Sequence, residues 1–329
     1  QELERNDIRI SRQNMAHWVI TAAERYLSLL WDRLKKEITS CSVVHADETP
    51  VSVVKDGREG MHKSYMWVYR NGGLQDDHPV VLYDFQLTRK KEAPGKFLDA
   101  FTGTLVTDGY QVYHSLEKDT ETQFKVAGCW AHARRKFADP VKAMGMEKAK
   151  NTVAYEALGL IQYIYRRDNE LKDLKSGERK RKRKSLIRPL VNDFFRWIRE
   201  VQPQVSRTSE TGKALTYCLN QEEYLRVFLE NPEIPMDNNA AERAIRPFCV
   251  GKKNWKLIDT IHGAEASAII YSIVETCKLN NLNIFYYISH LLTEIPKHMD
   301  DTNLDFLEDL LPWSEKLPEE CKKRIVEMK

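Results

Sequence analysis

The chain has 329 residues, which is enough for one large domain with insertions or for two to three modules. Hydrophobic residues make up 42% and aromatic residues 10%, so the composition permits a packed core and excludes wholesale disorder. The formal net charge is +3 with 30% charged residues, and a near-neutral total does not exclude local basic patches that bind nucleic acid.

The cysteines are widely scattered and form no CxxC pair, which excludes a disulfide framework and a four-cysteine zinc site. Since no secretory signal opens the sequence, a reducing cytoplasm is expected. No apolar run approaches the roughly 20 residues that span a bilayer, so no membrane partner is expected. The chain begins with Gln1 rather than Met, which is typical of a fragment or a processed chain.

Residues 8–38 predict a helix, because apolar residues such as Trp18, Leu27 and Leu34 recur near helical spacing. Ser11 is the predicted N-cap. The expected role of this helix is packing rather than chemistry.

Strand patterns begin at residue 42. Three runs rich in β-branched and aromatic residues (42–54, 64–70 and 79–87) predict an antiparallel meander, with a hairpin signalled by Gly and Asn in 71–78. A short helical stretch (93–101), a strand (103–110), a second strand (124–130) and a helix (131–144) follow. Because helical connections allow parallel neighbours, these elements predict an α/β fold with a mixed five-stranded sheet flanked by helices.

The strand signal disappears from residue 139 to residue 232, which predicts an all-helical insertion. It contains "KSGERKRKRKSLIR" (175–188), the densest basic run of the chain. This run is interpreted either as a solvated face or as a contact to a phosphate backbone. Beyond 232 the pattern predicts a helix of about two turns ended by Pro247, a helix at 263–281 and small helical elements from 281 onward.

Three carboxylates stand in different contexts. Asp47 lies late in the first strand, Asp108 ends another strand before Gly109, and Glu242 lies on the later helix. Each has an ordinary explanation. Asp47 could form a salt bridge or a turn, and Asp108 a turn. Glu242 could close a weak capping box with Asn239 or pair with Arg246.

Together the three carboxylates indicate a metal site. Neighbouring strands lie about 4.8 Å apart, so the two aspartates could converge, and a helix packed on the sheet could add Glu242. Convergent carboxylates repel one another unless a cation neutralises them. Hard oxygen ligands suit Mg²⁺ or Mn²⁺, and two such ions would support phosphoryl transfer.

Four blocks, "HADETPV", "TDGY", "GCWAHARRKF" and "DNNAAERAIRPFCVGKKNW", occur in the order that resembles the transposases of the insertion sequence 66 type. The resemblance spans about residues 10 to 315. It implies a DDE transposase with a ribonuclease-H-like catalytic fold, in which Asp47, Asp108 and Glu242 bind two Mg²⁺ (or Mn²⁺) ions. It also implies cutting at transposon ends by activated water, followed by attack of the freed 3′-hydroxyl on target DNA.

The resemblance further implies DNA as partner, a homo-oligomer on DNA, possible accessory transposition proteins and association with the nucleoid. Chains of the family usually carry an N-terminal zinc-binding region and a helix-turn-helix, of which "RISRQNMAHWV" is at most the last piece. The expected organisation is an N-terminal helical segment (1–40), a ribonuclease-H-like core in two parts (41–138 and 233–280), the helical insertion between them (139–232) and a helical tail (281–329).

Basic and histidine residues near these blocks are predicted to bind DNA. His132 is expected beside the catalytic centre, although a core histidine is equally compatible, and Cys129 with His132 supplies only two ligands of a zinc site. Glu48 should face away from Asp47, since side chains alternate along a strand, and Asp237 is interpreted as an N-cap. The predicted DNA contacts are His132, Arg134, Arg135, Lys136, Arg243, Arg246, Lys252 and Lys253.

Two alternatives stay open from the sequence. The first is a nuclease of the same fold that cuts DNA without joining strands. The second is a non-catalytic DNA-binding protein derived from a transposase, against which the presence of all three carboxylates argues.

Overall fold

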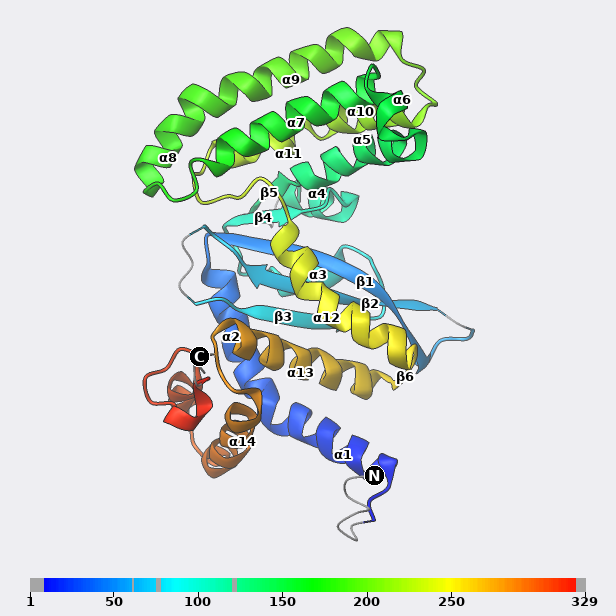
Figure 1. Cartoon of the computed structure of the whole chain (residues 1–329). Helices are drawn as coiled ribbons and strands as arrows, with labels where there is room; N and C mark the ends of the chain where they lie inside the picture. The colour runs from blue at the N-terminus through cyan, green and yellow to red at the C-terminus, as the bar shows by residue number, and fades with distance from the viewer. Residues whose placement is uncertain (1–8, 61, 75–77, 120–122, 324–329) are drawn as a thin grey trace, which may run out of the picture.

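A mixed sheet forms the centre of the protein, with helices on both faces and a helical region beyond the β5 edge (Figure 1). The structure is a computed structural model that describes residues 9–60, 62–74, 78–119 and 123–323. The strand order is β3-β2-β1-β4-β5, and β6 pairs with β1. The strands are β1 (Val43–Lys55), β2 (Lys63–Asn71), β3 (Val81–Gln86), β4 (Thr104–Thr107), β5 (Lys125–Gly128) and β6 (Ile258–Thr260).

The strand directions confirm the predicted mixed α/β sheet. β1, β2 and β3 form an antiparallel meander, and β4 and β5 run parallel to β1. The predicted count of five strands is wrong, because β6 adds a sixth that runs parallel to the outer part of β1, with Val53 opposite Ile258. Three residues are too few to leave an alternating pattern in the sequence.

One face of the sheet is covered by the N-terminal helices. Ser11 begins α1 (Arg12–Ala22) as predicted, since its side chain accepts from the Asn14 amide at 3.0 Å. A π-helical turn, η2 (Ala23–Leu27), leads into α2 (Ser28–Ser40), whose Leu34 is fully buried. The predicted packing role holds for α2, while α1 buries no residue fully and contacts α13 (Ile261–Leu279). α3 (Glu92–Phe97) and α4 (Gln111–Glu117) contribute to the same core.

The opposite face is crossed by α12 (Asn239–Trp255), which packs on β1 and β2. The predicted stop at Pro247 is wrong, because the helix continues for eight residues beyond it to Trp255. Proline removes one helical hydrogen bond at a cost of about 3 kcal/mol. The buried side chains of Ala244, Ile245 and Phe248 continue one apolar face across the proline, and their packing offsets that cost.

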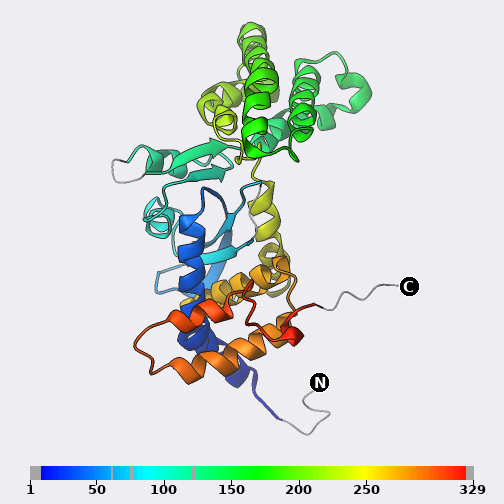
Figure 2. The same cartoon turned by 90° about the vertical axis from the view of Figure 1, so that its left-hand side faces the viewer.

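The β3 edge of the sheet is closed by α13 (Ile261–Leu279). Ser272 Oγ accepts from the Tyr83 amide at 2.7 Å, and Thr276 Oγ1 bonds both the amide and the carbonyl of Val81 at 3.0 Å. These hydroxyls satisfy backbone groups that an edge strand would otherwise expose. α14 (Ile284–Glu294) follows at the end of the molecule that also holds α1 (Figure 2). Across the described ranges, no helix has the length and apolarity to cross a membrane.

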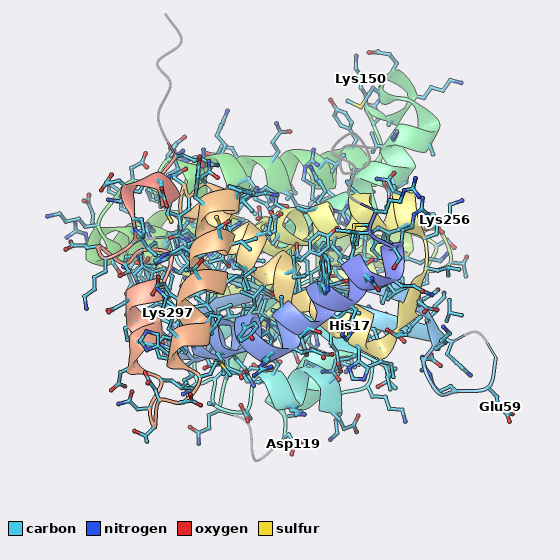
Figure 3. The ribbon with its side chains drawn as sticks, turned by 90° about the horizontal axis from the view of Figure 1, so that it is seen from below. His17, Glu59, Asp119, Lys150, Lys256 and Lys297 are labelled. Carbon is cyan, nitrogen blue, oxygen red and sulfur yellow. The ribbon has the colours of Figure 1, made fainter. Side chains whose placement is uncertain are left out.

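A region made of helices lies between β5 and α12 in the sequence and stands apart from the sheet (Figures 1 and 2). Seen from below, Lys150 of this region and Glu59 of the β1–β2 connection project from the body of the protein (Figure 3). The helices are α5 (Trp130–Met144), α6 (Met146–Ala149), α7 (Val153–Asn169), α8 (Ser176–Lys182), α9 (Arg188–Val201), α10 (Glu210–Asn220) and α11 (Glu222–Arg226).

Neither sequence interpretation of the basic run accounts for Arg179 and Arg183, which are each only 1% exposed. The guanidinium of Arg183 forms a bidentate pair with Asp168 at 2.7 and 2.9 Å and donates to the carbonyls of Phe228 and Ile234 at 2.9 Å. Arg179 donates to four further carbonyls in 171–174 and 232. The two arginines therefore bind the end of α7 to the segment that leads into α12.

Candidate active site

The strand register brings Asp47 and Asp108 to the same level of the sheet. β1 pairs in parallel with β4, and the last paired residues are His45 and Val106. Asp47 and Asp108 lie two residues beyond this last pair, in the directions of β1 and β4 respectively. Neighbouring strands are about 4.8 Å apart. Asp108 directly follows the end of β4, as predicted, whereas β1 continues past Asp47 to Lys55. Asp47 instead lies where β1 separates from β4.

Alternation along β1 directs Asp47 toward α12. Its neighbour Glu48 faces the other side, where it pairs with Arg89 and accepts from the Tyr113 hydroxyl at 3.4 Å, as predicted. Thr49, on the same side as Asp47, accepts from Lys252 of α12 at 2.9 Å. Asp47 is therefore on the sheet face that α12 covers.

Asn238 fixes the start of α12 on β1. Its fully buried side chain donates from Nδ2 to the Ala46 carbonyl at 2.8 Å, and its Oδ1 lies 2.9 Å from His45 Nδ1. The other ring nitrogen of His45 is 3.3 Å from the Gly72 carbonyl. A side chain on Gly72 would collide with this ring, since an added Cβ would lie 2.3 Å from His45 Cδ2. The network sets the position of Glu242, one helical turn further along.

Glu242 makes neither of the two local contacts that its sequence context suggested. Its carboxylate bonds Arg135 Nη2 at 3.3 and 3.2 Å, and its Oε1 lies 3.6 Å from His132 Nδ1. The predicted capping box is also wrong, since Asn239 is already inside the helix and its amide is bonded by Asp237 Oδ1 at 3.1 Å. The N-cap position is Asn238, so the predicted N-cap role of Asp237 is wrong by one residue, although the Asp237 side chain accepts from the first amide of the helix.

Asp108 is held by the turn after β4. Its Oδ1 accepts from the Tyr110 amide at 3.0 Å, and its carbonyl accepts from the Tyr217 hydroxyl at 3.1 Å. Gly109 has a φ of 89°, and an added Cβ would lie 3.0 Å from atoms of Tyr217 and Gln221. Glycine is required here for both reasons. The turn interpretation of Asp108 is correct and is compatible with a free second carboxylate oxygen.

The electrostatics of Asp47 reflect a cluster of like charges. Burial, together with the smaller effects of the nearby charges of Glu48, Asp108 and Glu242, raises the pKa of Asp47 to about 7, against the lowering effect of the bond from the Glu48 amide. A bound cation would lower the pKa of Asp47, because it stabilises the ionised form of the carboxylates. The donor set is made of hard oxygens, which fits Mg²⁺ or Mn²⁺.

A different trio lies closest together. Among the described residues, ligand atoms of Cys129, His132 and Glu242 all lie within 4.8 Å of one another, whereas Asp47, Asp108 and Glu242 do not form such a group. Burial raises the pKa of the Cys129 thiol to about 12, and its Sγ accepts from the Asn238 amide at 3.2 Å. This thiol is a poor zinc ligand, since zinc binds the thiolate. A second group, Glu24, His262 and Glu265, lies on the exposed surface.

The residues predicted to bind DNA occupy two helices. On α5, Arg134 and Lys136 are exposed, Lys136 Nζ lies 4.5 Å from the centre of the Tyr217 ring, and Arg135 pairs with Glu242. On α12, the exposed cations are Arg243, Arg246 and Lys253.

Lys252 differs from these cations. Its Nζ donates to Thr49 Oγ1 at 2.9 Å and to the Pro50 carbonyl at 2.7 Å, which favours a role in holding α12 on β1 over a contact to phosphate. His132 lies beside Glu242, as expected.

The sequence reasoning missed His45 and Asn238. Both stand inside the blocks that carry the family resemblance, His45 two residues before Asp47 and Asn238 four residues before Glu242. The sequence signal for His45 was its position within an apolar strand. Without further information, a histidine in such a strand is more often a core residue.

The structure thus presents three carboxylates on a mixed α/β sheet and its covering helix, with basic side chains around them. Comparison with known sequences identifies the class. The profile described as "Transposase IS66 family" matches residues 1–266, and the one described as "IS66 C-terminal element" matches residues 272–313. The chain belongs to the IS66 family of transposases.

Relatives in Sinorhizobium fredii (strain NBRC 101917 / NGR234) are similar along most of the chain. "Uncharacterized protein y4qI" is 29% identical over 321 residues, which are 94% of this chain and 57% of the relative. "Uncharacterized protein y4jD" is 28% identical over 318 residues, 93% of this chain and 60% of the relative. The chain therefore spans somewhat over half the length of these curated relatives.

Proposed function

We propose that this chain is the catalytic region of a DDE transposase with a ribonuclease-H-like core. Asp47, Asp108 and Glu242 would hold two divalent ions, Mg²⁺ or Mn²⁺, and act on DNA. The observation that supports this most is the shared level of Asp47 and Asp108 on parallel strands, on the sheet face covered by the helix of Glu242. The strand order β3-β2-β1-β4-β5 also fits such a core.

The proposed division of the chain into segments follows from the same assignment of a ribonuclease-H-like core. The core would comprise 41–138 and 233–280, with the helical insertion at 139–232 between the fifth strand and the Glu242 helix. α7 to α11 lie within that interval, while α5 begins before it. The segments 1–40 and 281–329 would flank the core.

The proposed chemistry divides between ions and protein. When bound, the ions would activate an oxygen nucleophile and stabilise the leaving oxygen of a phosphodiester. The protein positions Asp47 and Asp108 through the sheet register and Glu242 through Asn238. Glu242 must turn from Arg135 toward the aspartates for all three to share the ions. Arg243, Arg246 and Lys253, exposed on the same helix, would then bind DNA phosphates.

The test is metal binding combined with a DNA reaction. Titration calorimetry with Mn²⁺ should show binding by the wild type that Asp47→Asn, Asp108→Asn and Glu242→Gln each weaken by about tenfold or more. Asp84→Asn is the matched control, since Asp84 is a strand aspartate outside the site. DNA carrying the ends of the protein's own element should then be cut and joined to target DNA only in the presence of the metal.

The outcomes separate the alternatives. Cleavage without joining of precut ends would favour a nuclease of the same fold. Unchanged DNA processing by Asp47→Asn would contradict the metal mechanism. Mn²⁺ affinity that none of the three substitutions alters would contradict the site assignment. An oligomer on DNA and accessory transposition proteins remain part of the proposal, to be tested by the mass of the DNA complex.

A further inference from the structure

Two adjoining hollows lie between α5 and α7 and begin at the candidate active site. The first, of about 450 Å³, has Arg135 and Asn239 in its wall, and Arg135 pairs with Glu242. The second, of about 480 Å³, continues it and ends near Lys142 and Gly145. The two hollows, here called the α5–α7 groove, share Arg134, Ala138 and Gln162.

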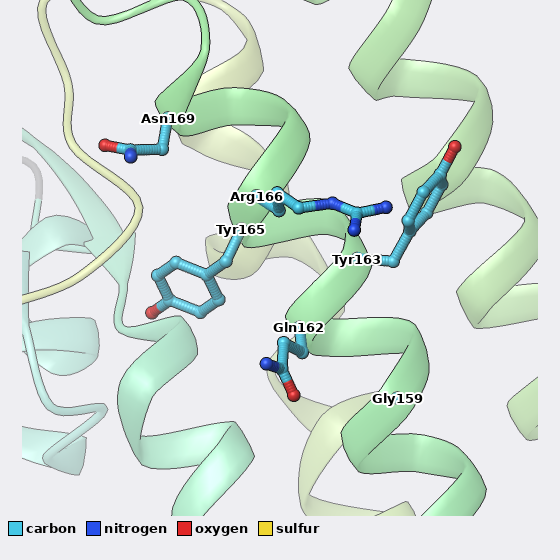
Figure 4. A pocket seen from close by; sticks show the side chains of 6 residues that line it. All are labelled: Gly159, Gln162, Tyr163, Tyr165, Arg166 and Asn169. Atoms are coloured by element: carbon cyan, nitrogen blue, oxygen red, sulfur yellow. The ribbon is translucent and has the colours of Figure 1, made fainter.

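A third hollow extends the groove over the outer face of α7. It encloses about 570 Å³ and shares Gln162 and Tyr165 with the first hollow. Tyr163 and Tyr165 project to opposite sides of α7, and Arg166 reaches toward Tyr163 (Figure 4). The Arg166 guanidinium lies 5.3 Å from the centre of the Tyr163 ring, and Tyr163 is 43% exposed.

The groove carries positive charge without acidic partners. In the part of the chain that the structure describes, no carboxylate pairs with Arg134, Lys142 or Arg166. The neighbouring Arg167, by contrast, pairs with Glu170 at 2.5 Å. The acidic residue in the groove wall is Asp237, whose carboxylate lies beside the Tyr165 hydroxyl. Cations left unpaired along a continuous groove are available to an anionic chain.

The chemistry and width of the groove fit one nucleic-acid strand. Packed helices lie about 8–10 Å apart, so the furrow between two of them is narrower than a duplex, whose major groove alone is about 12 Å wide. Sites for single strands combine cations that follow the backbone with aromatic faces on which bases stack. Arg134, Lys142 and Arg166 supply the first, and Tyr155 and Tyr163 the second.

We infer that the α5–α7 groove receives a single DNA strand that leaves the carboxylate site and separates from its complement. This rests on the proposed function, because it takes DNA as the substrate of that site. Arg135 connects the two, since it lines the groove and contacts Glu242.

The test measures DNA binding by fluorescence anisotropy without metal, so that catalysis plays no part. One probe is a blunt duplex of about two helical turns, and the other is the same duplex with a forked end of two unpaired tails of about ten thymidines each. The wild type should bind the forked probe about tenfold more tightly than the blunt one. The double variant Lys142→Glu/Arg166→Glu should lose this gain and keep its affinity for the blunt probe, since neither residue is a predicted contact to the duplex.

The control variant is Arg196→Glu/Arg207→Glu, which makes the same charge change at exposed positions of the helical region outside the groove. It should keep the gain from the fork, and both double variants should match the wild type in thermal unfolding. A gain that persists in Lys142→Glu/Arg166→Glu would overturn the inference, as would a wild type that binds both probes equally.

The failure of this inference can be told from the failure of the proposed function. Asp47→Asn should keep the gain from the fork, because the groove does not use the carboxylates. If the groove variants behave as the wild type while metal-dependent cleavage and joining occur, only the groove is wrong. If the wild type binds neither probe, both the DNA substrate and the groove are wrong.

Discussion

Arg135 Nη2 donates to both carboxylate oxygens of Glu242, at 3.3 and 3.2 Å. Arg135 belongs to α5 and Glu242 to α12, so this ion pair joins the helical region to the helix that covers the sheet. The pair occupies the carboxylate that the proposed mechanism assigns to metal. A cation and Arg135 therefore compete for Glu242.

Replacing Arg135 by Gln should strengthen Mn²⁺ binding. The side chains are 52% and 24% exposed, and a pair of this kind contributes about 0.5–1 kcal/mol, which corresponds to a two- to fivefold change in affinity. Titration calorimetry measures it, with Lys136→Gln as the neighbouring control. Weaker binding by Arg135→Gln would show that Arg135 supports the metal site instead of competing with it.

Asn238→Ala should both destabilise the protein and weaken the metal site. The substitution leaves the Ala46 carbonyl without its buried donor, at a cost of about 1–3 kcal/mol in the free energy of unfolding. Because Asn238 sets the start of α12, Mn²⁺ affinity should fall as well. Urea unfolding and calorimetry measure the two effects. Asn239→Ala, one residue further, is the control and should change Mn²⁺ affinity little. Equal Mn²⁺ affinities of Asn238→Ala and the wild type would show that α12 is placed without the help of Asn238.

Gly72→Ala should be costly only while His45 is present. The added Cβ would lie 2.3 Å from the ring, and overpacking of this kind costs about 1–3 kcal/mol. In an His45→Ala background the same substitution should cost close to nothing. The free energies of unfolding of the four proteins form a double-mutant cycle. If the effects of Gly72→Ala and His45→Ala on the free energy of unfolding were additive, the contact between residue 72 and the His45 ring would be contradicted.

Arg183→Met should lower the free energy of unfolding by about 3–5 kcal/mol, because it leaves Asp168 as a buried charge without its partner. Lys184→Met, at an exposed neighbouring position, should change it by less than about 0.5 kcal/mol. Chemical denaturation compares the two. If both substitutions changed the free energy of unfolding by similar amounts, the buried contact of Arg183 would be contradicted and the basic run would be interpreted as a solvated face.

Asp84 should make the stability depend on pH. Burial raises the pKa of Asp84 to about 6, against lowering contributions from Gln86, Lys35 and Lys96, whereas an unfolded aspartate ionises near its ordinary value of 3.8. Between these values the folded state holds the proton that the unfolded state has released, so stability falls as the pH rises from about 4 to about 6.

The variant Asp84→Asn removes this titration. Its free energy of unfolding relative to the wild type should rise by about 2 kcal/mol across that pH window and stay level above it. Urea unfolding at several pH values measures the difference. A constant difference from pH 4 to 6 would mean that Asp84 titrates normally. Asp99→Asn, at an exposed position, is the control.

Much of the sheet could be predicted from the sequence, because alternation and turn residues report on local backbone. The meander of β1 to β3 and the parallel β4 and β5 are as expected. The length of α12 could not be predicted, since Pro247 is a strong local signal that packing on the sheet overrides. β6 was missed because it exists through its partner, the outer part of β1.

The sequence proposes the residues of the candidate site, and these stay a prediction, but it does not predict their contacts. Asp47 and Asp108 follow from strand order. The partner of Glu242 does not, because Arg135 is 107 residues away in sequence. Arg179 and Arg183 show the same limit, since a basic run gives no sign of which members point inward. The roles of His45 and Asn238 likewise depend on a contact between segments 193 residues apart.

The hydroxyls of Ser272 and Thr276 have a consequence for assembly. They occupy the outward backbone groups of β3, and at the other border of the sheet Glu117 accepts from the Val126 amide of β5 at 2.7 Å. A partner strand would find these bonds already made, which disfavours pairing with a second copy at Val81 and Tyr83 of β3 and at Val126 of β5. A complex of several copies is therefore expected to form through surfaces other than these positions of the two border strands.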